Sequence, residues 1–483
     1  MRRIREWLRS RRAQPAAAER ARARLRTQVW PAGTHELLER LAGGEGRAYL
    51  VGGTVRDALL GRPAHPILDV ATDRTPDEVM RRFERVEPIG IRHGTVLVIE
   101  RGLAAECTTF RREGAYSDAR RPDTVVFTRD PIPDLARRDL TVNALAWDPR
   151  REELLDPYGG ATDLERRVLR AVGDPEQRFR EDALRPLRVA RLAAVLEMEP
   201  EPATRVALAS VPDRARRIAW ERVGQEFRLM MRAKRPSVGF ELLLESGLLA
   251  LWMPELARCR GVPQNRWHAY DVYGHSLETA DAAPADKPHV RWAALLHDIG
   301  KPDTRVERDG EGTFYHHESV GAELADALLS RLRHPHDERQ RIVHLVREHM
   351  FDFRAEWSDA ALRRWVRRVG LDSIADLFDL RIADVIGNGL KPGFPATLEV
   401  MRDRIERLIA ESRALEVRDL AVDGTDVMRV LGLSPGPAVG AALERLLEDV
   451  LDDPRRNSRE RLLDRLESMT VAGETPAGGA PAP

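Results

Sequence analysis

Two glycines, an arginine and an aspartate stand close together between Tyr49 and Thr72, in YLVGGTVRDALLGRPAHPILDVAT. An apolar run of strand length opens this stretch, and Gly52 and Gly53 follow it directly. A helical segment, Thr54 to Leu60, carries Arg56 in its first turn. A strand that turns through glycines into a helix N-terminus presents free backbone N–H groups, which bind anions. The pattern therefore predicts a phosphate-binding turn.

Two carboxylates are expected beside this turn. A second strand, Ile67 to Ala71, carries Asp69, and a later strand, Ala105 to Phe110, carries Glu106. If these strands are neighbours in one sheet, the two acids lie side by side. Phosphoryl and nucleotidyl transfer require neutralised phosphate charge and an activated hydroxyl, and divalent metals held by carboxylates provide both.

Histidines and aspartates form a second group of chemically active residues farther along the chain. The segment AALLHDIGKP is an apolar helix that ends at His297 and Asp298, with Gly300 as the breaker, and His275 and Asp384 stand at a distance in the sequence. Imidazole and carboxylate together suit a transition metal, and a bound metal lowers the pKa of its water for attack on phosphate.

The elements that position these groups indicate an α+β fold that is mainly α. Strand and helix signals alternate as far as Val172, and helical signals dominate from Gly173 onward. The expected segments are a basic extension (1–28), a small head with a mixed β-sheet (29–172), an all-helical neck (173–250), a His-rich helical body (251–390), a helical tail (391–470) and a disordered end (471–483).

Composition limits the partners and the compartment. Lys and Arg total 78 of 483 residues and balance 78 Asp and Glu, so a polyanion must bind a local basic face. The two cysteines, Cys107 and Cys259, fit a reducing, cytoplasmic compartment and exclude a disulfide scaffold. No signal peptide is visible and no apolar run approaches ~20 residues, so no membrane partner is expected.

The stretch around the two glycines resembles the head-domain signature of tRNA nucleotidyltransferases (CCA-adding enzymes) and bacterial poly(A) polymerases. This resemblance implies a nucleotidyltransferase head that binds Mg²⁺ through two aspartates, one residue apart on a strand, and a third acid on a later strand. On the alignment fixed by Thr72 and Asp73, Asp69 is the second aspartate and Glu106 is the third acid. Asp69 and Glu106 are thus the expected catalytic and metal-binding acids.

The chain departs from the family pattern at the first aspartate. Ile67 stands at its position, and one extra residue lies between Gly61 and Asp69. As a β-branched residue in a strand, Ile67 is expected to be buried in the sheet. His65 is a candidate substitute ligand, although Mg²⁺ prefers oxygen.

The same resemblance implies a nucleotide site. Arg138, Asp139 and Asn143 match the family's RRDFTxNA motif, and the segment EDALR matches its nucleotide-selecting helix. A carboxylate there accepts a hydrogen bond from an exocyclic amine, and an arginine donates to ring acceptors. The expected nucleotide-binding residues are Gly52, Gly53, Arg56, Arg138, Asp139, Asn143, Asp182, Arg185, Arg188 and Arg191. The last two either reach phosphates or pair with acids on the helix surface.

The histidine group resembles the HD phosphohydrolase superfamily. Its ordered set comprises His275, His297, Asp298 and Asp384, and the extra histidines of two-metal members are matched by His317 and His349. The resemblance implies a divalent transition metal, Mn, Fe, Co or Ni. Similarity to bacterial nucleotidyltransferases with a fused HD domain extends from about Val51 to Asn457.

Two functions remain open at this point. In the first, the enzyme adds CMP, AMP or both from CTP and ATP to the 3′ end of tRNA or another RNA, with a rate lowered by Ile67; poly(A) addition is a variant. In the second, the head binds nucleotide or RNA without transfer, and the HD site is a metal-dependent phosphohydrolase or phosphodiesterase. The complete HD set disfavours a purely RNA-binding, non-enzymatic role.

Overall fold

The computed structural model describes residues 15–114, 125–264, 269–308, 311–351, 356–390, 396–411 and 416–471. The first half of the basic extension and residues 472–483 of the expected disordered end lie outside this part. The chain divides into two compact units, Met1–Arg258 with Leu328–His334 and Cys259–Ala327 with Pro335–Pro483. Within the described residues, no helix has the length and apolar character needed to cross a membrane.

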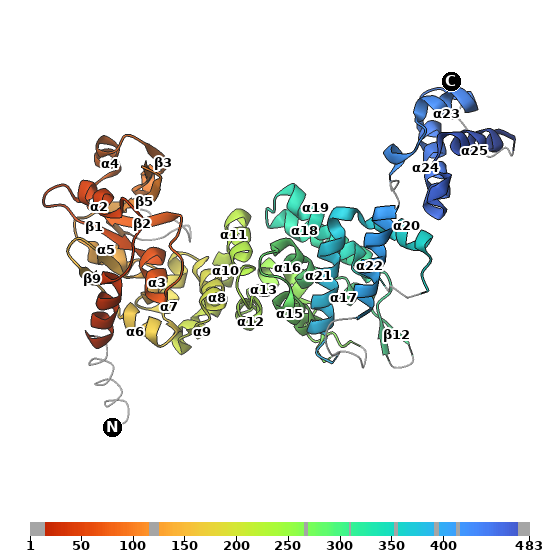
Figure 1. Cartoon of the computed structure of the whole chain (residues 1–483). Helices are drawn as coiled ribbons and strands as arrows, with labels where there is room; N and C mark the ends of the chain where they lie inside the picture. Colours follow the sequence, from red (N-terminus) through yellow and green to blue (C-terminus); the bar gives the residue numbers. More distant parts are fainter. Residues whose placement is uncertain are drawn as a thin grey trace, which may run out of the picture. The chain divides into compact units, whose positions relative to one another are not determined.

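A mixed seven-stranded sheet forms the centre of the head, in the order β3-β4-β5-β2-β1-β8-β9 (Figure 1). Its strands are β1 (Ala48–Val51), β2 (Ile67–Thr72), β3 (Val86–Gly90), β4 (Thr95–Glu100), β5 (Leu103–Thr109), β8 (Ala146–Asp148) and β9 (Glu153–Leu155). Within this sheet β2 and β5 run parallel, whereas the other neighbouring strands are antiparallel. The expected mixed sheet is therefore confirmed.

Helices connect and cover these strands. They are α2 (Thr34–Ala42), α3 (Gly52–Leu60), α4 (Pro76–Arg82), α5 (Pro131–Ala136) and α6 (Gly160–Glu165), and a small hairpin pairs β6 (Arg111–Glu113) with β7 (Val125–Phe127). The helix after β1 begins at Gly52, two residues earlier than the sequence pattern predicts. Thr75 caps α4 in a reciprocal capping box with Glu78, which satisfies backbone N–H groups at the helix start.

The neck begins with a break that the sequence analysis did not anticipate. The segment EDALR, which matches the family's nucleotide-selecting helix, does not lie on one helix: α7 (Pro175–Glu181) ends at Glu181, and α8 (Arg185–Leu196) begins at Arg185. Asp182 has extended backbone, with φ −134° and ψ 106°. Pro186 explains the break, because in a continuous helix its ring would clash with the carbonyl of residue 182.

Short helices complete the first unit. They are α9 (Pro202–Ala207), α10 (Pro212–Ala215), α11 (Trp220–Met230), α12 (Ser237–Glu245), α13 (Leu249–Trp252) and α14 (Pro254–Ala257), with a two-stranded pairing of β10 (Val168–Leu169) and β11 (Glu199–Pro200). Stacked rings of Phe227 and Phe240, 5.7 Å apart, and the edge of Trp252 join α11, α12 and α13 in a buried aromatic core.

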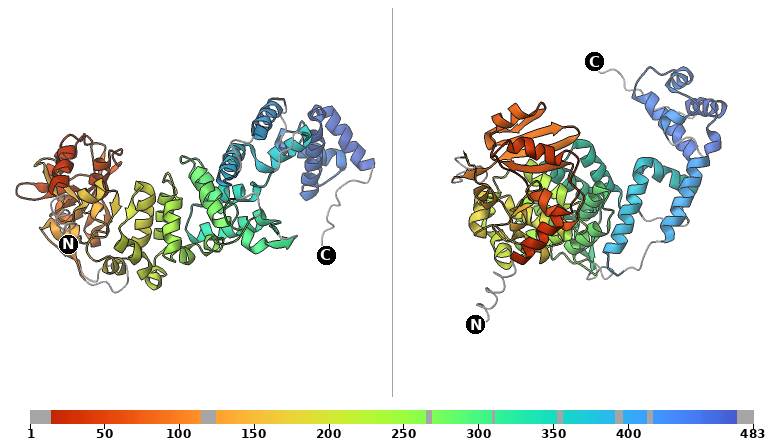
Figure 2. Two further views of the ribbon diagram at one scale, coloured as in Figure 1. Left: turned by 90° about the horizontal axis from the view of Figure 1, so that it is seen from below. Right: turned by 60° about the vertical axis from the view of Figure 1, so that its left-hand side comes forward.

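The second unit is almost entirely helical, as the neighbouring helices in the green to blue part of Figure 2 illustrate. Its described elements are α15 (Val272–Ala282), α16 (Pro288–Leu296), α17 (Lys301–Thr304), β12 (Val306–Arg308), β13 (Glu311–Thr313), α18 (His317–Arg331), α19 (His336–Glu348), α20 (Asp359–Val369), α21 (Leu371–Gly387), α22 (Ala396–Glu411), α23 (Gly424–Leu431), α24 (Pro437–Asp452) and α25 (Arg459–Val471). The last turn of α18 groups with the first unit.

Candidate functional site

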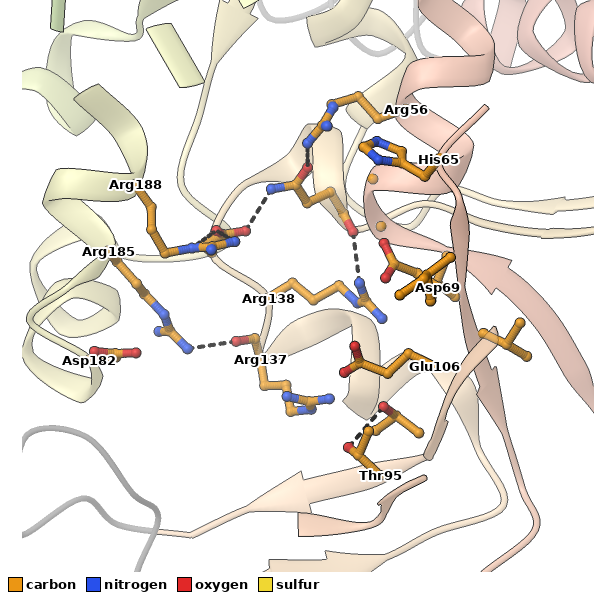
Figure 3. Close-up of a pocket in the computed structure, with 18 of the residues that line it drawn as sticks. Arg56, His65, Asp69, Thr95, Glu106, Arg137, Arg138, Asp182, Arg185 and Arg188 are labelled. Carbon is orange, nitrogen blue, oxygen red and sulfur yellow. Dashed lines mark hydrogen bonds and ion pairs between the residues drawn. The ribbon is translucent and has the colours of Figure 1, made fainter. Parts of the chain in front are cut away.

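Asp69 and Glu106 lie directly opposite each other on β2 and β5. Both line a cavity of about 740 Å³ whose wall extends from the head to α8 and α11 (Figure 3). Burial and the neighbouring Asp69 carboxylate raise the pKa of Glu106 above its usual range. A cation bound between the two carboxylates would stabilise the ionised form of Glu106.

The two glycines at the start of α3 bring backbone close to this acid pair. Gly52 has φ +59°, and a Cβ atom there would lie 2.8 Å from Nη1 of Arg138. A Cβ atom at Gly53 would lie 3.3 Å from Oδ2 of Asp69. Larger residues at either position would push against the charged groups of the cavity, so the glycines are needed for close approach.

Ile67 also lines the cavity, two residues before Asp69 and on the same face of β2. Its side chain is 43% exposed, so the expectation of a buried strand residue is wrong. The reason is its place at the first residue of the strand, beside the cavity. His65 reaches the same cavity, but its Nε2 lies 2.5 Å from Oδ2 of Asp57, an acid of α3.

Positive charge dominates the cavity wall. Seven arginines line it, Arg56, Arg111, Arg137, Arg138, Arg185, Arg188 and Arg191, against four carboxylates, Asp69, Glu106, Asp139 and Asp182. An excess of guanidinium over carboxylate in a concave site suits a polyphosphate, which guanidinium binds through paired N–H donors.

Hydrogen bonds join the predicted nucleotide residues of the head into one chain (Figure 3). Nη1 of Arg56 donates to Oδ1 of Asn143 at 2.7 Å, and Nδ2 of Asn143 donates to Oδ1 of Asp139 at 2.9 Å. Arg138 donates to the backbone carbonyl of Asn143 at 3.3 Å. The structure therefore brings these residues together, although Arg138 and Asp139 follow α5 and are not on a helix.

Buried acids hold Arg188 and Arg191 of α8. Nε of Arg188 donates to Oδ2 of Asp139 at 2.8 Å, and both Arg188 and Arg191 form ion pairs with Glu226 at 3.3 and 2.7 Å. Burial alone would raise the pKa of Asp139, but Arg188 and a hydrogen bond from Asn143 hold it well below its usual range. The acids that pair with Arg188 and Arg191 thus belong to the head and to α11. The expected alternative, in which these arginines pair with acids on the helix surface, is wrong.

The two expected base-reading residues line the same cavity, although only Arg185 lies on a helix. Asp182 is in the break before α8 and pairs with Arg222 of α11 at 2.8 Å. Arg185 pairs with Glu181 at 2.7 Å. Sequence reasoning missed Arg222 and Glu226, which share a face of α11 with i, i+4 spacing. No local motif marks them, because their partners stand about 40 residues away.

In the second unit, the HD residues form two ligand sets that share Asp298. His275, His297 and Asp298 make the first set, and Asp298, His317 and His349 make the second; within each set the ligand atoms lie within 4.8 Å of one another. Oδ2 of Asp298 lies 3.1 Å from Nε2 of His297, and Oδ1 lies 3.3 Å from Nε2 of His317.

Asp384, the remaining member of the expected set, joins the first group from α21. Its Oδ1 lies 3.1 Å from Nε2 of His275, and Arg381 donates to its Oδ2 at 2.8 Å. Lys301, which sequence reasoning did not single out, donates to Oδ2 of Asp298 at 2.6 Å. Burial alone would raise the pKa of Asp298, whereas His297 and Lys301 hold it well below its usual range.

Backbone carbonyls orient three of the four imidazoles. Nδ1 of His297, His317 and His349 each lies 2.7 Å from the carbonyl three residues earlier. A carbonyl can only accept, so Nδ1 carries the proton and Nε2 presents a lone pair. Nε2 of His317 and Nε2 of His349 are 3.3 Å apart. Two lone pairs that face each other at this distance fit a shared cation. A carbonyl that accepts a hydrogen bond from Nδ1 is a usual outer-shell partner of a metal-bound histidine.

Family models match three stretches of the chain. Residues 48–170 match the poly A polymerase head domain, residues 197–259 match a probable RNA and SrmB-binding site of polymerase A, and residues 268–389 match the HD domain. The first range contains the acid pair, and the last contains both histidine sets.

Whole-chain relatives agree with these matches. The CCA-adding enzyme of Levilactobacillus brevis is 32% identical over 422 residues, which cover 86% of this chain and 92% of that protein. The A-adding tRNA nucleotidyltransferase of Deinococcus radiodurans is 39% identical over 335 residues, 65% of this chain and 74% of that protein. The structure of the Bacillus stearothermophilus CCA-adding enzyme in complex with CTP has a TM-score of 0.71 at 26% identity, covering 92% of this chain and 99% of that one.

Proposed function

Because the chain belongs to the family of CCA-adding enzymes and related tRNA nucleotidyltransferases, we propose that it transfers CMP, AMP or both from CTP and ATP to the 3′ end of tRNA. The observation that carries this proposal is the pairing of Asp69 with Glu106 in one arginine-lined cavity with Asp182 and Arg185. One cavity thus offers acids for a metal, arginines for a triphosphate and a carboxylate–guanidinium pair for a base edge.

In the proposed reaction, the 3′-hydroxyl oxygen of the RNA attacks the α-phosphorus of the bound nucleotide. The bond from this phosphorus to the bridging oxygen breaks, pyrophosphate leaves and the hydroxyl proton passes to solvent. Arg56 and Arg138 hold the phosphates next to the glycine backbone of α3, and Asp182 and Arg185 hold the base. Positioning and charge neutralisation are the main contributions of these side chains.

Asp69 and Glu106 are the residues that would hold Mg²⁺. Their oxygen donors and the raised pKa of Glu106 fit a hard cation, and the hydrocarbon of Ile67 limits the set to two carboxylates. Mg²⁺ bound there supplies phosphate charge neutralisation and lowers the pKa of the attacking hydroxyl.

Incubating the protein with labelled CTP or ATP and tRNAs that end before the first C, after one C or after two C residues tests this function. The expected result is extension of at least one of these ends, and the one extended distinguishes CCA, CC and A addition. Asp69→Asn, which keeps the side-chain shape, should lower the rate about 10²–10³-fold. Absence of extension with every tRNA end would exclude the proposal.

The HD centre supports a second activity, hydrolysis of a phosphate ester. The observation that favours it is the convergence of two imidazole sets on the carboxylate of Asp298, with the Nε2 atoms directed toward one another and toward that carboxylate. We propose Mn, Fe, Co or Ni as the bound metal, because imidazole-rich sets suit these ions. The metal supplies an activated water at neutral pH.

Hydrolysis of bis(p-nitrophenyl) phosphate with each of these metals tests the second activity. His297→Ala should remove it, while Asp69→Asn in the head should leave it unchanged. If hydrolysis by the wild type is not above background with any of the four metals, the HD centre has no such activity.

A further inference from the structure

We propose that Arg222 of α11 is a positioning residue for base selection, because it restricts Asp182 to a single free acceptor site. This inference rests on the proposed nucleotide site and adds a determinant from a part of the chain outside the nucleotide motifs. Arg222 and Asp182 are separated by 40 residues and meet at 2.8 Å beside the cavity.

The contacts of Asp182 account for three of its acceptor sites. Oδ1 accepts from the backbone N–H of Leu184 at 3.0 Å and from Nη1 of Arg222 at 3.5 Å. Oδ2 accepts from Nη2 of Arg222 at 2.8 Å. An ionised carboxylate has about four acceptor sites, two on each oxygen, so one site remains, on Oδ2.

A single acceptor next to the base edge selects for an exocyclic amine. Cytosine presents the N4 amino group and adenine presents the N6 amino group at this position, whereas the O4 of uracil and the O6 of guanine are acceptors. An acceptor facing an acceptor leaves both without a partner, and such mismatches are strongly rejected. Without Arg222, the carboxylate of Asp182 could rotate. It would then accept a hydrogen bond from water or from a base in a second orientation.

Arg185 is restricted in a complementary way. Its Nη1 donates to the carbonyl of Arg178 and to Oε2 of Glu181, both at 2.7 Å, and its Nη2 donates to the carbonyl of Arg137 at 2.9 Å. Of the five guanidinium N–H donors, two remain, one on Nε and one on Nη2. Asp182 and Arg185 together thus present one acceptor and two donors in fixed places.

The helix that carries Arg222 is itself held close to a neighbouring backbone. A Cβ atom at Gly224 would lie 1.9 Å from the carbonyl oxygen of Leu332. Only glycine permits this approach. The backbone from which the Arg222 side chain extends is therefore held in place, as the positioning of Asp182 requires.

Three variants of the full-length protein test this role: Arg222→Met, Arg222→Lys and Arg228→Met. The last is the matched control, since it removes the same side chain from the same helix away from Asp182. Affinities for CTP, UTP, ATP and GTP are measured by calorimetry, together with incorporation of each nucleotide into tRNA and the melting temperature. The binding measurements give an answer whether or not transfer occurs.

In Arg222→Met, the preference for CTP over UTP and for ATP over GTP should fall about 5- to 150-fold, the discrimination expected from one bidentate contact. Arg222→Lys should lie between Arg222→Met and the wild type, and Arg228→Met should keep the wild-type preference. An unchanged preference in Arg222→Met, or an equal loss in Arg228→Met, would overturn the inference. Selective binding without any tRNA extension would instead refute the proposed transferase.

Discussion

Ile67 places a branched hydrocarbon beside Asp69 and Glu106, where a nucleotidyltransferase has to neutralise phosphate charge. The residues proposed to hold the base and the triphosphate do not include Ile67. Losing one carboxylate should therefore slow the chemical step more than it weakens nucleotide binding. The wild type is expected to bind CTP or ATP well and to transfer slowly.

Restoring the family pattern at this strand should increase the rate. In the variant Ile67→Asp with Pro66 deleted, tRNA extension should rise about 10²–10³-fold, which corresponds to roughly 3–4 kcal/mol of transition-state stabilisation. Single-turnover kinetics measure the change, and Ile67→Asn with the same deletion is the control for shape without charge. A wild type that already turns over at ~10 per second would contradict this account, because another group would then supply the missing ligand.

At the scale of elements, the ion-pair chain through Asp139, Arg188 and Glu226 ties the head to α8 and α11. Asp139→Asn removes the charge at the head end of this chain and should destabilise the protein by about 2–3 kcal/mol at pH 7, since Arg188 is one-third exposed. Calorimetric melting measures this loss, with the exposed Asp213→Asn as control. Equal melting of both variants at pH 7 would contradict it.

The pH dependence of that loss follows from the lowered pKa of Asp139. A group with a depressed folded-state pKa stabilises the protein above its unfolded pKa, about 3.9, and the contribution is lost as the pH falls toward the folded value. The difference between the wild type and Asp139→Asn should therefore be constant from pH 7 to 5 and shrink below about pH 4.

The two ligand sets of the HD centre lead to a prediction about metal content. His297→Ala breaks one of the two ligand sets, so bound Mn, Fe, Co or Ni should fall by at least about half in elemental analysis of purified protein. His316→Ala is the matched control, because His316 is exposed and next to a ligand. Identical metal content in His297→Ala and in the wild type would show that this centre holds no ion.

For the whole molecule, the two candidate centres fall in separate compact units, so their activities should be separable. Asp69→Asn should lower the rate of tRNA extension about 10²–10³-fold and leave the metal content of the HD centre unchanged. His297→Ala should retain extension within about twofold of the wild type. A large loss of extension in a His297→Ala protein with normal melting would mean that the units are coupled.

The fold class and the acid pair were predictable because the relevant signals are local. The glycine turn, the β2 strand pattern and the HD segment each occupy a few consecutive residues, and strand pairing then places Asp69 opposite Glu106. The helix break at Asp182 could also have been predicted, because Pro186 stands four residues later and its ring would clash with the carbonyl of Asp182 in a continuous helix.

The contribution of α11 could not be predicted in the same way. Arg222 and Glu226 look like ordinary charged residues on a helix surface, and only the packing of α11 beside α8 brings them to Asp182, Arg188 and Arg191. Long-range ion pairs leave no periodic pattern in one sequence. The exposure of Ile67 was missed for a related reason, because a β-branched residue fits a strand equally well at a buried position and at a cavity rim.

The shared carboxylate of Asp298 has a consequence for how the HD centre fills. Its two oxygens face different imidazole sets, so ions in both sets would lie close together and repel each other. The first ion should bind tightly and the second more weakly, which makes full occupancy depend on the metal supply of the cell. A calorimetric titration of metal-free protein with Mn²⁺ should accordingly show two unequal steps, and hydrolysis should follow the second.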